Sequence, residues 1–582
     1  MKKHSILLVV MLVITIVANG QFTNGKKASL NPDGSILIES ILFSDEVNEY
    51  RSDIEMLEGF PFGSQANPSF KNFRGAAIAD LDNDGVKEII FGAYSKLFVL
   101  KGNGELLWSR VLNGTLIYPP TVADMDNDGD LEVIVNTGGV PNNGRVYLMD
   151  HLGNDLPGWP LNFDDHWMFN APSVSDVNSD GLLEIVSCER GTSTSGFLHL
   201  IKLDGTPFNS NWPLELPGNL AFTPSIGDVN NDGSINIVIS ISSGSLYVLN
   251  LDGGILDGFP LTEANKGFSY QSPILVDLTG DKKLEIVGSR HGDSPDYYAV
   301  KSDGTYLEGW PIESSGWRYS PPTVVDIDDN GEYEIYVGHP NVDNGGFPLN
   351  TVYGFNAQAE NLDHFPIVKH GGCEGVISVA DVNNDGVEDI IFTSNITDAD
   401  GFGFIHAYSL DGSGEISGFP LRPHGFTFIN SAVLGDIDND GLLDLSCLSY
   451  TQFTGNDSIF ISAYNLGVVY DETKILANGY KGNNLRDGLV DRIYLGINDL
   501  SSTNLNIQLS PNPSSGRLNI QFAEKITNAD LMIFNSMGVL VKKTNIQDRK
   551  TVEINMSDIP AGQYLIQLKG KGVFFSEKWI KL

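Results

Sequence analysis

The chain has 582 residues, a formal net charge of −38 and only three cysteines. So strong a negative charge, without any visible Lys/Arg cluster, excludes nucleic acid as a partner, because phosphate binding needs such clusters. The length is too great for one ordinary hydrophobic core and favours a large β architecture or an array of repeats. Three cysteines cannot form a full disulfide framework, so we interpret them as buried thiols.

Residues 1–20 have the features of a cleaved secretory signal peptide. Two lysines precede the apolar run ILLVVMLVITIV, and a small-x-small site ends at Gly20. The run is about a dozen residues long, whereas a membrane-spanning helix needs about 20. No later segment is long and apolar enough to span a bilayer. We therefore expect export, with residues 21–54 as a lead-in to the folded part.

An acidic pattern repeats along residues 55–470. The spacing Asp-x-Asp/Asn-x-Asp/Asn, once with threonine in the middle position, occurs eight times at offsets of 44 to 55 residues. A period of roughly 40 to 50 residues is typical of β-propeller blades. The first aspartates of the eight loops are Asp80, Asp124, Asp176, Asp228, Asp277, Asp326, Asp381 and Asp436.

Each repeat has the same order of parts, as residues 120–163 show. The short apolar segment PTVAD leads into the acidic loop, which is followed by the β-branched run LEVIVN, a polar turn and the alternating segment GRVYLMD. Four short strands per unit is the natural interpretation. The second strands are apolar on both faces, which implies that sheets stack face to face as propeller blades do. We therefore predict an all-β chain built around an eight-bladed β-propeller.

An aromatic-Pro element marks the outer strand of the units, where proline is tolerated because an edge strand can lack an amide donor. Seven copies occur, and the first, at residues 59–61, precedes the first acidic loop. This copy therefore has no blade of its own. We infer that it supplies the outer strand of the last blade, which begins near Asp436, and so closes the ring.

The acidic loops have the composition of calcium sites. Calcium takes about 6 to 8 oxygen ligands, and side chains at positions 1, 3 and 5 can point into one cavity while glycine at position 6 allows a sharp reversal. An acid or amide at position 9 then closes the cage. A single copy could be a solvated turn, but eight copies at one phase favour calcium, with up to one ion per blade. The predicted ligands are Asp80, Asp82, Asp84 and Glu88; Asp124, Asp126, Asp128 and Glu132; Asp176, Asn178, Asp180 and Glu184; Asp228, Asn230, Asp232 and Asn236; Asp277, Asp281 and Glu285; Asp326, Asp328, Asn330 and Glu334; Asp381, Asn383, Asp385 and Asp389; and Asp436, Asp438, Asp440 and Asp444.

The eight loops are not equal. Those that begin at Asp80, Asp124 and Asp436 offer four acids each, whereas the loop at Asp228 has asparagine at two ligand positions. The loop at Asp277 departs most, because threonine stands at position 3 and lysine replaces the glycine at position 6. We expect this loop to bind calcium weakly or not at all.

The pattern changes after about residue 470. Residues 471–504 are polar and rich in glycine and asparagine, and we interpret them as a linker. Residues 505–582 hold ten Lys/Arg against six Asp/Glu, a net charge of +4, while the rest of the chain is strongly acidic. Alternating segments such as RLNIQF and GQYLIQLKG predict a small C-terminal antiparallel β-sandwich.

The acidic turns followed by apolar strands resemble the FG-GAP and related VCBS repeats of integrin α-chain propellers and of many bacterial secreted proteins. The resemblance covers roughly residues 55–470, although the FG and GAP words are only partly present, as in IIFGAY. It implies loops that bind calcium on one face of a propeller and partners that bind the other face. Integrins have seven blades, which is the alternative to the eight that the eight loops favour.

The segments LSPNPSSGRLNIQF, DIPAGQYLIQL and KWIKL resemble the C-terminal sorting domain of the type IX secretion system of Bacteroidota. This resemblance covers residues 505–582. It implies that the domain is an export address for the type IX secretion machinery, either removed or linked to surface polysaccharide. The protein is then expected to be secreted or to lie on the outer cell surface.

Aromatic residues recur just before the first strand of several units, in loops that the family resemblance places opposite the calcium face. They can stack on sugar rings or on a partner protein, or they can pack between blades near the axis, and we prefer the packing interpretation. The residues concerned are His166, Trp167, Phe169, Phe268, Tyr270, Trp317, Arg318, Tyr319, His424, Phe426 and Phe428.

The sequence contains no nucleophile elbow, metalloprotease helix, P-loop or dinucleotide-binding turn. We therefore expect a secreted or cell-surface calcium-binding propeller that acts as a non-catalytic binding or adhesion module for a glycan or an extracellular protein. The alternative is a glycan-active enzyme, similar to a polysaccharide lyase, on the same scaffold. It would need a base such as His166, His291, His370 or His424 beside a cation or an arginine.

Overall fold

The structure is a computed structural model, and the chain forms two units, of which the first ends at Val490. The expected signal peptide at residues 1–20 lies outside the described residues. The structure describes residues 23–30, 36–43, 53–67, 74–138, 143–164, 166–190, 195–220, 222–267, 272–314, 319–340, 349–451, 457–490, 508–510, 516–535, 540–557, 559, 562–570 and 573–581.

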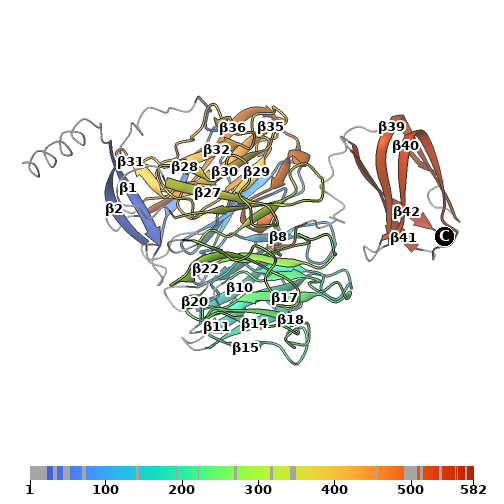
Figure 1. Ribbon diagram of the computed structural model, residues 1–582, viewed down its shortest axis with the longest axis horizontal. Helices are drawn as coiled ribbons and strands as arrows, with labels where there is room; N and C mark the ends of the chain where they lie inside the picture. Colours follow the sequence, from blue (N-terminus) through green and yellow to red (C-terminus); the bar gives the residue numbers. More distant parts are fainter. Residues whose placement is uncertain are drawn as a thin grey trace, which may run out of the picture. The chain divides into compact units, whose positions relative to one another are not determined.

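Short antiparallel strands make up most of the described part of the first unit (Figure 1). In successive sets of four, the strands of each set are hydrogen-bonded into one sheet. In the first half of this unit the sets are β4 (Ala77–Ala79), β5 (Glu88–Ala93), β6 (Lys96–Leu100) and β7 (Leu106–Val111); β8 (Thr121–Ala123), β9 (Glu132–Thr137), β10 (Asn143–Met149) and β11 (Leu161–Asp164); β12 (Ser173–Ser175), β13 (Glu184–Glu189), β14 (Ser195–Ile201) and β15 (Leu214–Pro217); and β16 (Ser225–Gly227), β17 (Asn236–Ser240), β18 (Ser245–Asn250) and β19 (Leu261–Thr262).

The second half of the first unit continues the same pattern. The sets are β21 (Ile274–Val276), β22 (Glu285–Gly292), β23 (Asp296–Val300) and β24 (Ile312–Glu313), with β20 (Lys266–Gly267) added to β22; β25 (Thr323–Val325), β26 (Glu334–Gly338), β27 (Leu349–Phe355) and β28 (Ile367–Lys369); β29 (Ser378–Ala380), β30 (Asp389–Thr393), β32 (Ile405–Ser409) and β33 (Gly414–Glu415); and β34 (Ala432–Gly435), β35 (Leu442–Tyr450), β36 (Ser458–Val469) and β3 (Phe62–Gln65). We interpret each of these eight sheets of the described residues as one blade.

The sheets stack face to face because their second strands are apolar on both sides. The strands β5, β9, β13 and β17 are buried along their whole length. One hydrophobic cluster joins Ile90 and Val99 of the first sheet to Val133 and Tyr147 of the second. Burial of apolar surface contributes about 25 cal/mol per Å², so this stacking stabilises the unit and leaves the turns between strands at its two ends.

The ring closes through a strand from the start of the chain. Strand β3 pairs with β36, with Phe62 opposite Ile461, and the aromatic-Pro element at residues 59–61 directly precedes it. From β4 to β25, the innermost strands of neighbouring sheets contact one another, and β34 of the last sheet contacts β4 of the first. A hydrophobic cluster spans this junction and contains both Ile89 and Leu448. The fold is therefore the β-propeller that the sequence predicts, and the inferred closure is confirmed.

Residues 475–490, which we call the axial segment, run along the innermost strands. The backbone N–H groups of Val122, Val174 and Ile226, in three successive innermost strands, donate to carbonyl oxygens of this segment at 2.9 to 3.1 Å. These amides lie at open sheet edges, where they would otherwise lack partners. The segment contains β37 (Ile475–Ala477), which pairs with β29, and two 3₁₀ helices, η1 (Glu472–Lys474) and η2 (Tyr480–Gly482), precede and follow that strand.

Two buried cations anchor the axial segment. The Arg486 guanidinium donates to the carbonyl oxygens of Tyr480 at 2.7 Å and Pro120 at 3.1 Å. The Lys481 ammonium donates to Ser225 Oγ at 2.8 Å. The sequence interpretation of residues 471–504 as a linker does not anticipate these contacts, and the described part of that stretch belongs to the propeller unit.

The lead-in expected at residues 21–54 contains a β-hairpin. Strands β1 (Thr23–Leu30) and β2 (Ile36–Phe43) pair with each other, and β1 also pairs with β31 (Ile396–Asp398) of the propeller (Figure 1). Ala28 of the hairpin is fully buried in a cluster of aromatic side chains. The hairpin therefore covers part of the propeller's aromatic interior.

The second unit is a small β-sandwich. Strand β39 pairs with β38, β40 and β41, and its register with β40 breaks between Gln521 and Ile526, where the strands bend. Leu518 before the bend and Leu531 after it lie in one hydrophobic cluster with Trp579. The predicted sandwich is therefore present. Its strands are β38 (Gln508–Ser510), β39 (Arg517–Asn535), β40 (Leu540–Asn555), β41 (Gly562–Gly570) and β42 (Val573–Lys581).

Candidate metal sites

Each acidic loop is the turn between the first and second strands of a sheet. In the loop at Asp124, the Asp124 carboxylate accepts the backbone N–H groups of Asp128 and Gly129, both at 3.1 Å. Asn127 and Gly129 have φ angles of 60° and 101°, a left-handed region that asparagine and glycine enter at low cost. The residue types at positions 4 and 6 therefore shape the loop without any help from a metal.

The residue at position 9 points back into the loop. Glu132, at the start of β9, accepts the backbone N–H of Met125 with Oε2 at 2.9 Å. The structure describes all eight loops throughout, and the same bond between positions 9 and 2 occurs in each, at 2.8 to 3.1 Å. The bond ties the position-9 side chain to the loop in all eight repeats.

Among the described residues, three groups of acidic side chains are compact enough to hold a metal ion. In each group, ligand oxygens from positions 1, 3 and 9 lie within 4.8 Å of one another. The groups are Asp80, Asp82 and Glu88; Asp124, Asp126 and Glu132; and Asp436, Asp438 and Asp444. They belong to the three loops with four acids that the sequence ranks first.

Several oxygens of these groups are buried without a hydrogen-bond partner. Burying a carboxylate oxygen in this state is costly unless a cation compensates it. Calcium prefers oxygen ligands and accepts irregular geometry, so it fits these donors. The oxygens are Asp80 Oδ1, Asp82 Oδ1, Glu88 Oε1, Asp126 Oδ1, Asp436 Oδ1 and Asp444 Oδ1.

The position-9 acids of the three compact groups have strongly raised pKa values. Burial, together with repulsion from the neighbouring aspartates, raises the pKa of Glu88, Glu132 and Asp444 to about 7, although the backbone N–H bond at position 2 opposes the shift. A cation among these oxygens removes the repulsion and favours the ionised form. Burial raises the pKa of Glu285 and Asp389 to about 7 as well, so this shift is common to the loops and does not single out the three compact groups.

The loops at Asp176, Asp228 and Asp326 keep the turn but are not among the compact acidic groups of the described residues. Each has a positive φ angle at positions 4 and 6. In the loop at Asp228, Asn230 Oδ1 is buried without a hydrogen-bond partner. That oxygen is available to a cation, although asparagine supplies no charge.

The loop at Asp277 satisfies its first aspartate internally. Asp277 Oδ1 accepts the backbone N–H of Gly280 at 2.7 Å, and Asp277 Oδ2 accepts that of Lys282 at 2.7 Å. Lys282, which stands where the other loops have glycine, has a φ angle of 71°, which is strained for a residue with a side chain. Asp124 also gives both oxygens to loop amides, so the loop at Asp277 differs instead in Thr279, which stands at position 3, and in the absence of a compact acidic group among its described residues.

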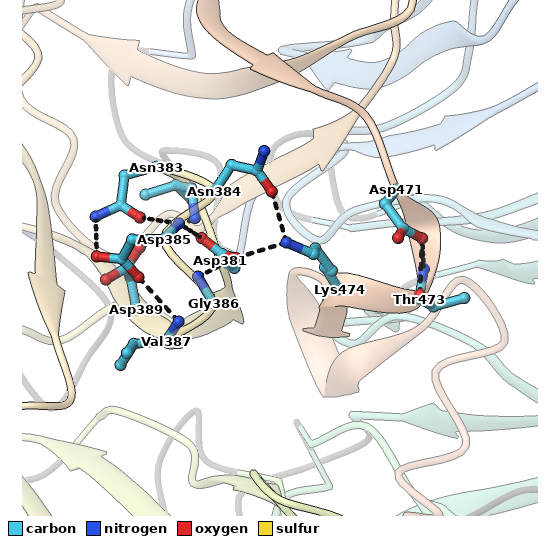
Figure 2. A network of polar contacts seen from close by, with 11 residues as sticks. Asp381, Asn383, Asn384, Asp385, Gly386, Val387, Asp389, Asp471, Thr473 and Lys474 are labelled. Atoms are coloured by element: carbon cyan, nitrogen blue, oxygen red, sulfur yellow. Dashed lines mark hydrogen bonds and ion pairs between the residues drawn. The ribbon is translucent and has the colours of Figure 1, made fainter. Parts of the chain in front are cut away.

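In the loop at Asp381, a lysine from outside the loop contacts the first aspartate (Figure 2). Lys474 Nζ lies 2.7 Å from Asp381 Oδ2 and 2.6 Å from Asn384 Oδ1. Burial acts to raise the pKa of Asp381, but the lysine and the loop amides outweigh it and hold this pKa below its ordinary value. At Asp80 and Asp436 burial raises the pKa. Sequence reasoning missed Lys474, because no local pattern marks a partner 93 residues away.

Most of the predicted aromatic residues that the structure describes are buried. Phe169, Tyr319, Phe426 and Phe428 lie in one hydrophobic cluster and are at most 2% exposed. Trp167 is partly buried against the same cluster. These residues therefore pack inside the propeller, as the packing interpretation holds. The others, Phe268, Tyr270, Trp317 and Arg318, lie outside the described residues.

His424 differs, because it is exposed and belongs to a group of aromatic rings that we call the aromatic patch, Phe402, His424 and Phe460. The His424 ring meets Phe402 and Phe460 edge to face, with centroids 5.6 and 5.3 Å apart. Phe402 is 38% exposed. His424 precedes β34 whereas the loop at Asp436 follows β34, so the patch lies at the opposite end of the strands from the acidic loops.

The histidines suggested as catalytic bases lie on different sheets. His166 Nδ1 contacts the Glu189 carboxylate, which also binds His199 Nε2 at 2.6 Å. His291 lies in β22, whereas His370 follows β28 and His424 precedes β34. The four histidines therefore belong to different sheets, and the sheet order does not group them.

Two family models match parts of the chain. The model described as an FG-GAP-like repeat matches residues 80–135 and 124–187, and the model described as a secretion system C-terminal sorting domain matches residues 508–582. The chain therefore carries FG-GAP-like repeats and a tail for type IX secretion to the outer cell surface or the extracellular space. Within the described stretches of chain, no helix has the length and apolar character needed to cross a membrane. A search of the curated proteins finds no significant match.

Solved structures with a similar chain path share little sequence with the protein. The V. cholerae biofilm matrix protein Bap1 is 13% identical with a TM-score of 0.44, and the match covers 74% of this chain and 90% of that one. The quinohemoprotein alcohol dehydrogenase from Comamonas testosteroni is 11% identical with a TM-score of 0.43, and the match covers 73% of this chain and 79% of that one. The Pseudomonas aeruginosa PilY1 C-terminal domain is 11% identical with a TM-score of 0.32, over 66% and 93% of the two chains.

Proposed function

We propose that the protein is a calcium-binding β-propeller, secreted or held at the cell surface, that acts as a non-catalytic binding or adhesion module for a glycan or an extracellular protein. Calcium stiffens the ring at the acidic loops, and the ligand binds at the opposite end of the strands. The observation that carries the proposal is the set of three compact acidic groups with buried, unpartnered oxygens, because such groups are unfavourable without a hard cation.

The acids and amides at positions 1, 3, 5 and 9 of the loops other than the one at Asp381 are the proposed side-chain ligands. The loops at Asp80, Asp124 and Asp436 fill first, since each combines four acids with a compact group. The loop at Asp277 fills last, because threonine replaces the acid at position 3 and Lys282 and Lys283 add positive charge. Bound calcium supplies positive charge among the carboxylates and so removes the repulsion that destabilises the metal-free turns.

The aromatic patch is the proposed ligand contact. Aromatic rings at a surface offer flat apolar faces that suit the apolar face of a sugar ring or a side chain of a partner protein. The patch stands on short turns of a sheet stack, so little conformational entropy is lost when a ligand binds. Arg422 lies beside it, where its guanidinium donates to the Gly403 carbonyl at 3.0 Å and is ion-paired with Asp398.

Binding to immobilised polysaccharides and surface proteins, measured with residues 21–582 in calcium and in EGTA, tests the proposal. The double variant Phe402→Ala, His424→Ala should weaken binding by about tenfold or more, because central aromatic contacts dominate such surfaces. Leu152→Ala is the matched control, since Leu152 is an exposed apolar residue, at 62%, in another sheet. Unweakened binding by the double variant would show that the ligand does not bind at the aromatic patch. Release of unsaturated sugar products would favour a lyase.

A further inference from the structure

One lysine links the Asp381 loop to the start of the axial segment. Lys474 is the last residue of η1 and directly precedes β37. Its Nζ contacts Asp381 Oδ2 at 2.7 Å and Asn384 Oδ1 at 2.6 Å, and its carbonyl oxygen accepts the Asp381 N–H at 3.3 Å. The loop and the axial segment are therefore joined by side chain and backbone at the same point (Figure 2).

The ion pair neutralises the loop from outside the cage. The Asp381 side chain is 1% exposed and that of Lys474 is 34% exposed. Figure 2 shows Lys474 reaching Asp381 and Asn384 from the side away from Asp385 and Asp389. The buried Asp381 carboxylate thus has a permanent cation from the chain itself, and this cation leaves the remaining acids of the loop where they are.

The corresponding aspartates of the three compact acidic groups are held differently. Asp80, Asp124 and Asp436 accept the backbone N–H of the glycine at position 6, at 3.0 to 3.1 Å. Asp381 makes the same bond to Gly386 at 3.0 Å and adds the lysine. The turn is therefore the same in all four loops. The loop at Asp381 differs in the added ammonium and in Asn383, which replaces the acid at position 3, while Asp389 Oδ1 stays buried without a hydrogen-bond partner.

The position of Lys474 gives the ion pair a structural task. The axial segment begins one residue later, and its carbonyl oxygens accept backbone N–H groups from the open inner edges of several sheets. A segment whose carbonyl oxygens accept amides from several sheets must be held in register at its start, because a shift would leave those buried amides unpaired. The Lys474–Asp381 pair is placed where it can supply that constraint.

On the basis of the calcium function proposed for the other loops, we propose that Lys474 is the resident cation of the Asp381 loop and fastens the axial segment to the propeller without metal. A calcium ion at this loop would meet a carboxylate that already carries an ammonium partner, and the two cations repel each other. Removal of the ammonium leaves the Asp381 carboxylate without its cation and makes the loop more negative. The loop then becomes a calcium site.

Hydrogen exchange of the full secreted chain in EGTA tests the fastening role. With Lys474→Met, the amides of residues 475–490 should exchange on the order of tenfold faster than in the wild type, because the start of the segment opens more often. Asp381→Asn, which breaks the pair from the loop side, should have the same effect. Lys87→Met is the matched control, since Lys87 Nζ contacts Glu472 of the same turn at 3.5 Å. It should leave the exchange of residues 475–490 unchanged.

Calcium binding, measured by equilibrium dialysis, tests the alternative occupancy of the loop. Lys474→Met should bind one calcium ion more per chain than the wild type, whereas Asp381→Asn should not. Unchanged exchange in both variants, or no additional ion in Lys474→Met, would overturn the proposal. A wild type that binds no calcium would instead contradict the proposed function of the other loops, and the comparison of exchange in EGTA would still decide the role of Lys474.

Discussion

The loops at Asp124 and Asp277 share one turn and differ in what their side chains leave for a metal. In both, the position-9 glutamate accepts the N–H of position 2, at 2.9 and 2.8 Å. In the first loop, Asp126 Oδ1 is buried without a partner, whereas threonine replaces that acid in the second and the Lys282 N–H takes Asp277 Oδ2. Hydrogen bonds therefore build the turn, and the oxygens that remain without a partner form the candidate metal site.

Removal of calcium should have the largest effect on stability, because it acts at once on all the loops that resemble the one at Asp124, those with a compact acidic group. A ligand that binds only the folded state contributes about 2.7 kcal/mol per site at 100 times its Kd, so three filled loops should contribute several kcal/mol. Thermal unfolding in millimolar calcium and in excess EGTA measures the difference. Equal melting temperatures in the two buffers would show that all the acidic loops, including the one at Asp124, are turns without metal.

The second prediction compares one loop of each kind directly. Asp124→Ala should lose about 2 kcal/mol of calcium-dependent stability, defined as the difference between the free energies of unfolding in calcium and in EGTA. Asp277→Ala should lose less than about 0.5 kcal/mol of that difference, because its loop holds little calcium. Denaturant unfolding of the two variants in both buffers measures these values, and a larger loss for Asp277→Ala would reverse the ranking.

Asp444→Asn separates the cost of burial from the gain of metal binding. Burial raises the pKa of Asp444 from 3.8 to about 7 in the metal-free fold. The protonated carboxyl therefore contributes stability that is complete below the unfolded pKa and is lost as the pH rises through 7. In EGTA at about pH 8, the asparagine variant should be more stable than the native chain by about 1 kcal/mol, and near pH 3 the two should be equal.

Calcium should reverse the order of these two chains at about pH 8, because asparagine cannot supply the charge that the cation favours. Denaturant unfolding across this pH range, with and without calcium, measures both effects. A larger free energy of unfolding for the native chain than for Asp444→Asn, in EGTA at about pH 8, would mean that the buried carboxylate has a partner other than calcium.

The smallest effect is expected from a variant that makes the loop at Asp277 resemble the loop at Asp124. The double variant Thr279→Asp, Lys282→Gly restores an acid at position 3 and relieves the positive φ angle of Lys282. Calcium affinity depends on the number of charged ligands, so the variant should bind one ion more per chain and gain about 1 kcal/mol or less in calcium. Equilibrium dialysis counts the ions. An unchanged count would show that the backbone of this loop, and not its side chains, excludes the metal.

The elements that sequence reasoning predicted are those that depend on short spacings. The acid or amide at position 9 returns to position 2 in every loop because eight residues of turn and strand suffice to place it, as Glu132 and Met125 show. The closure of the ring was also predictable, since the aromatic-Pro element before Phe62 lacked a blade of its own. Alternation of apolar residues was enough to predict the small sandwich around Trp579.

The elements that it did not predict depend on partners far apart in the chain. The axial segment looks like a polar linker in composition, and only the open edges of several sheets give its asparagine and basic residues their partners. The aromatic residues divide into buried Phe426 and exposed His424, two positions apart, according to which way the chain turns between two sheets. Phe402 and Phe460 join His424 from two different turns, so no local motif marks the patch.

By itself, the sequence determined the repeating unit of this protein, its acidic turns and the number of acids that each turn offers, because each depends on residue types within about ten positions of chain. Only the tertiary structure decided which carboxylate oxygens remain without partners and which loop receives a lysine instead. Those outcomes depend on burial and on contacts such as Lys474 with Asp381, which arise when distant segments meet in the closed ring.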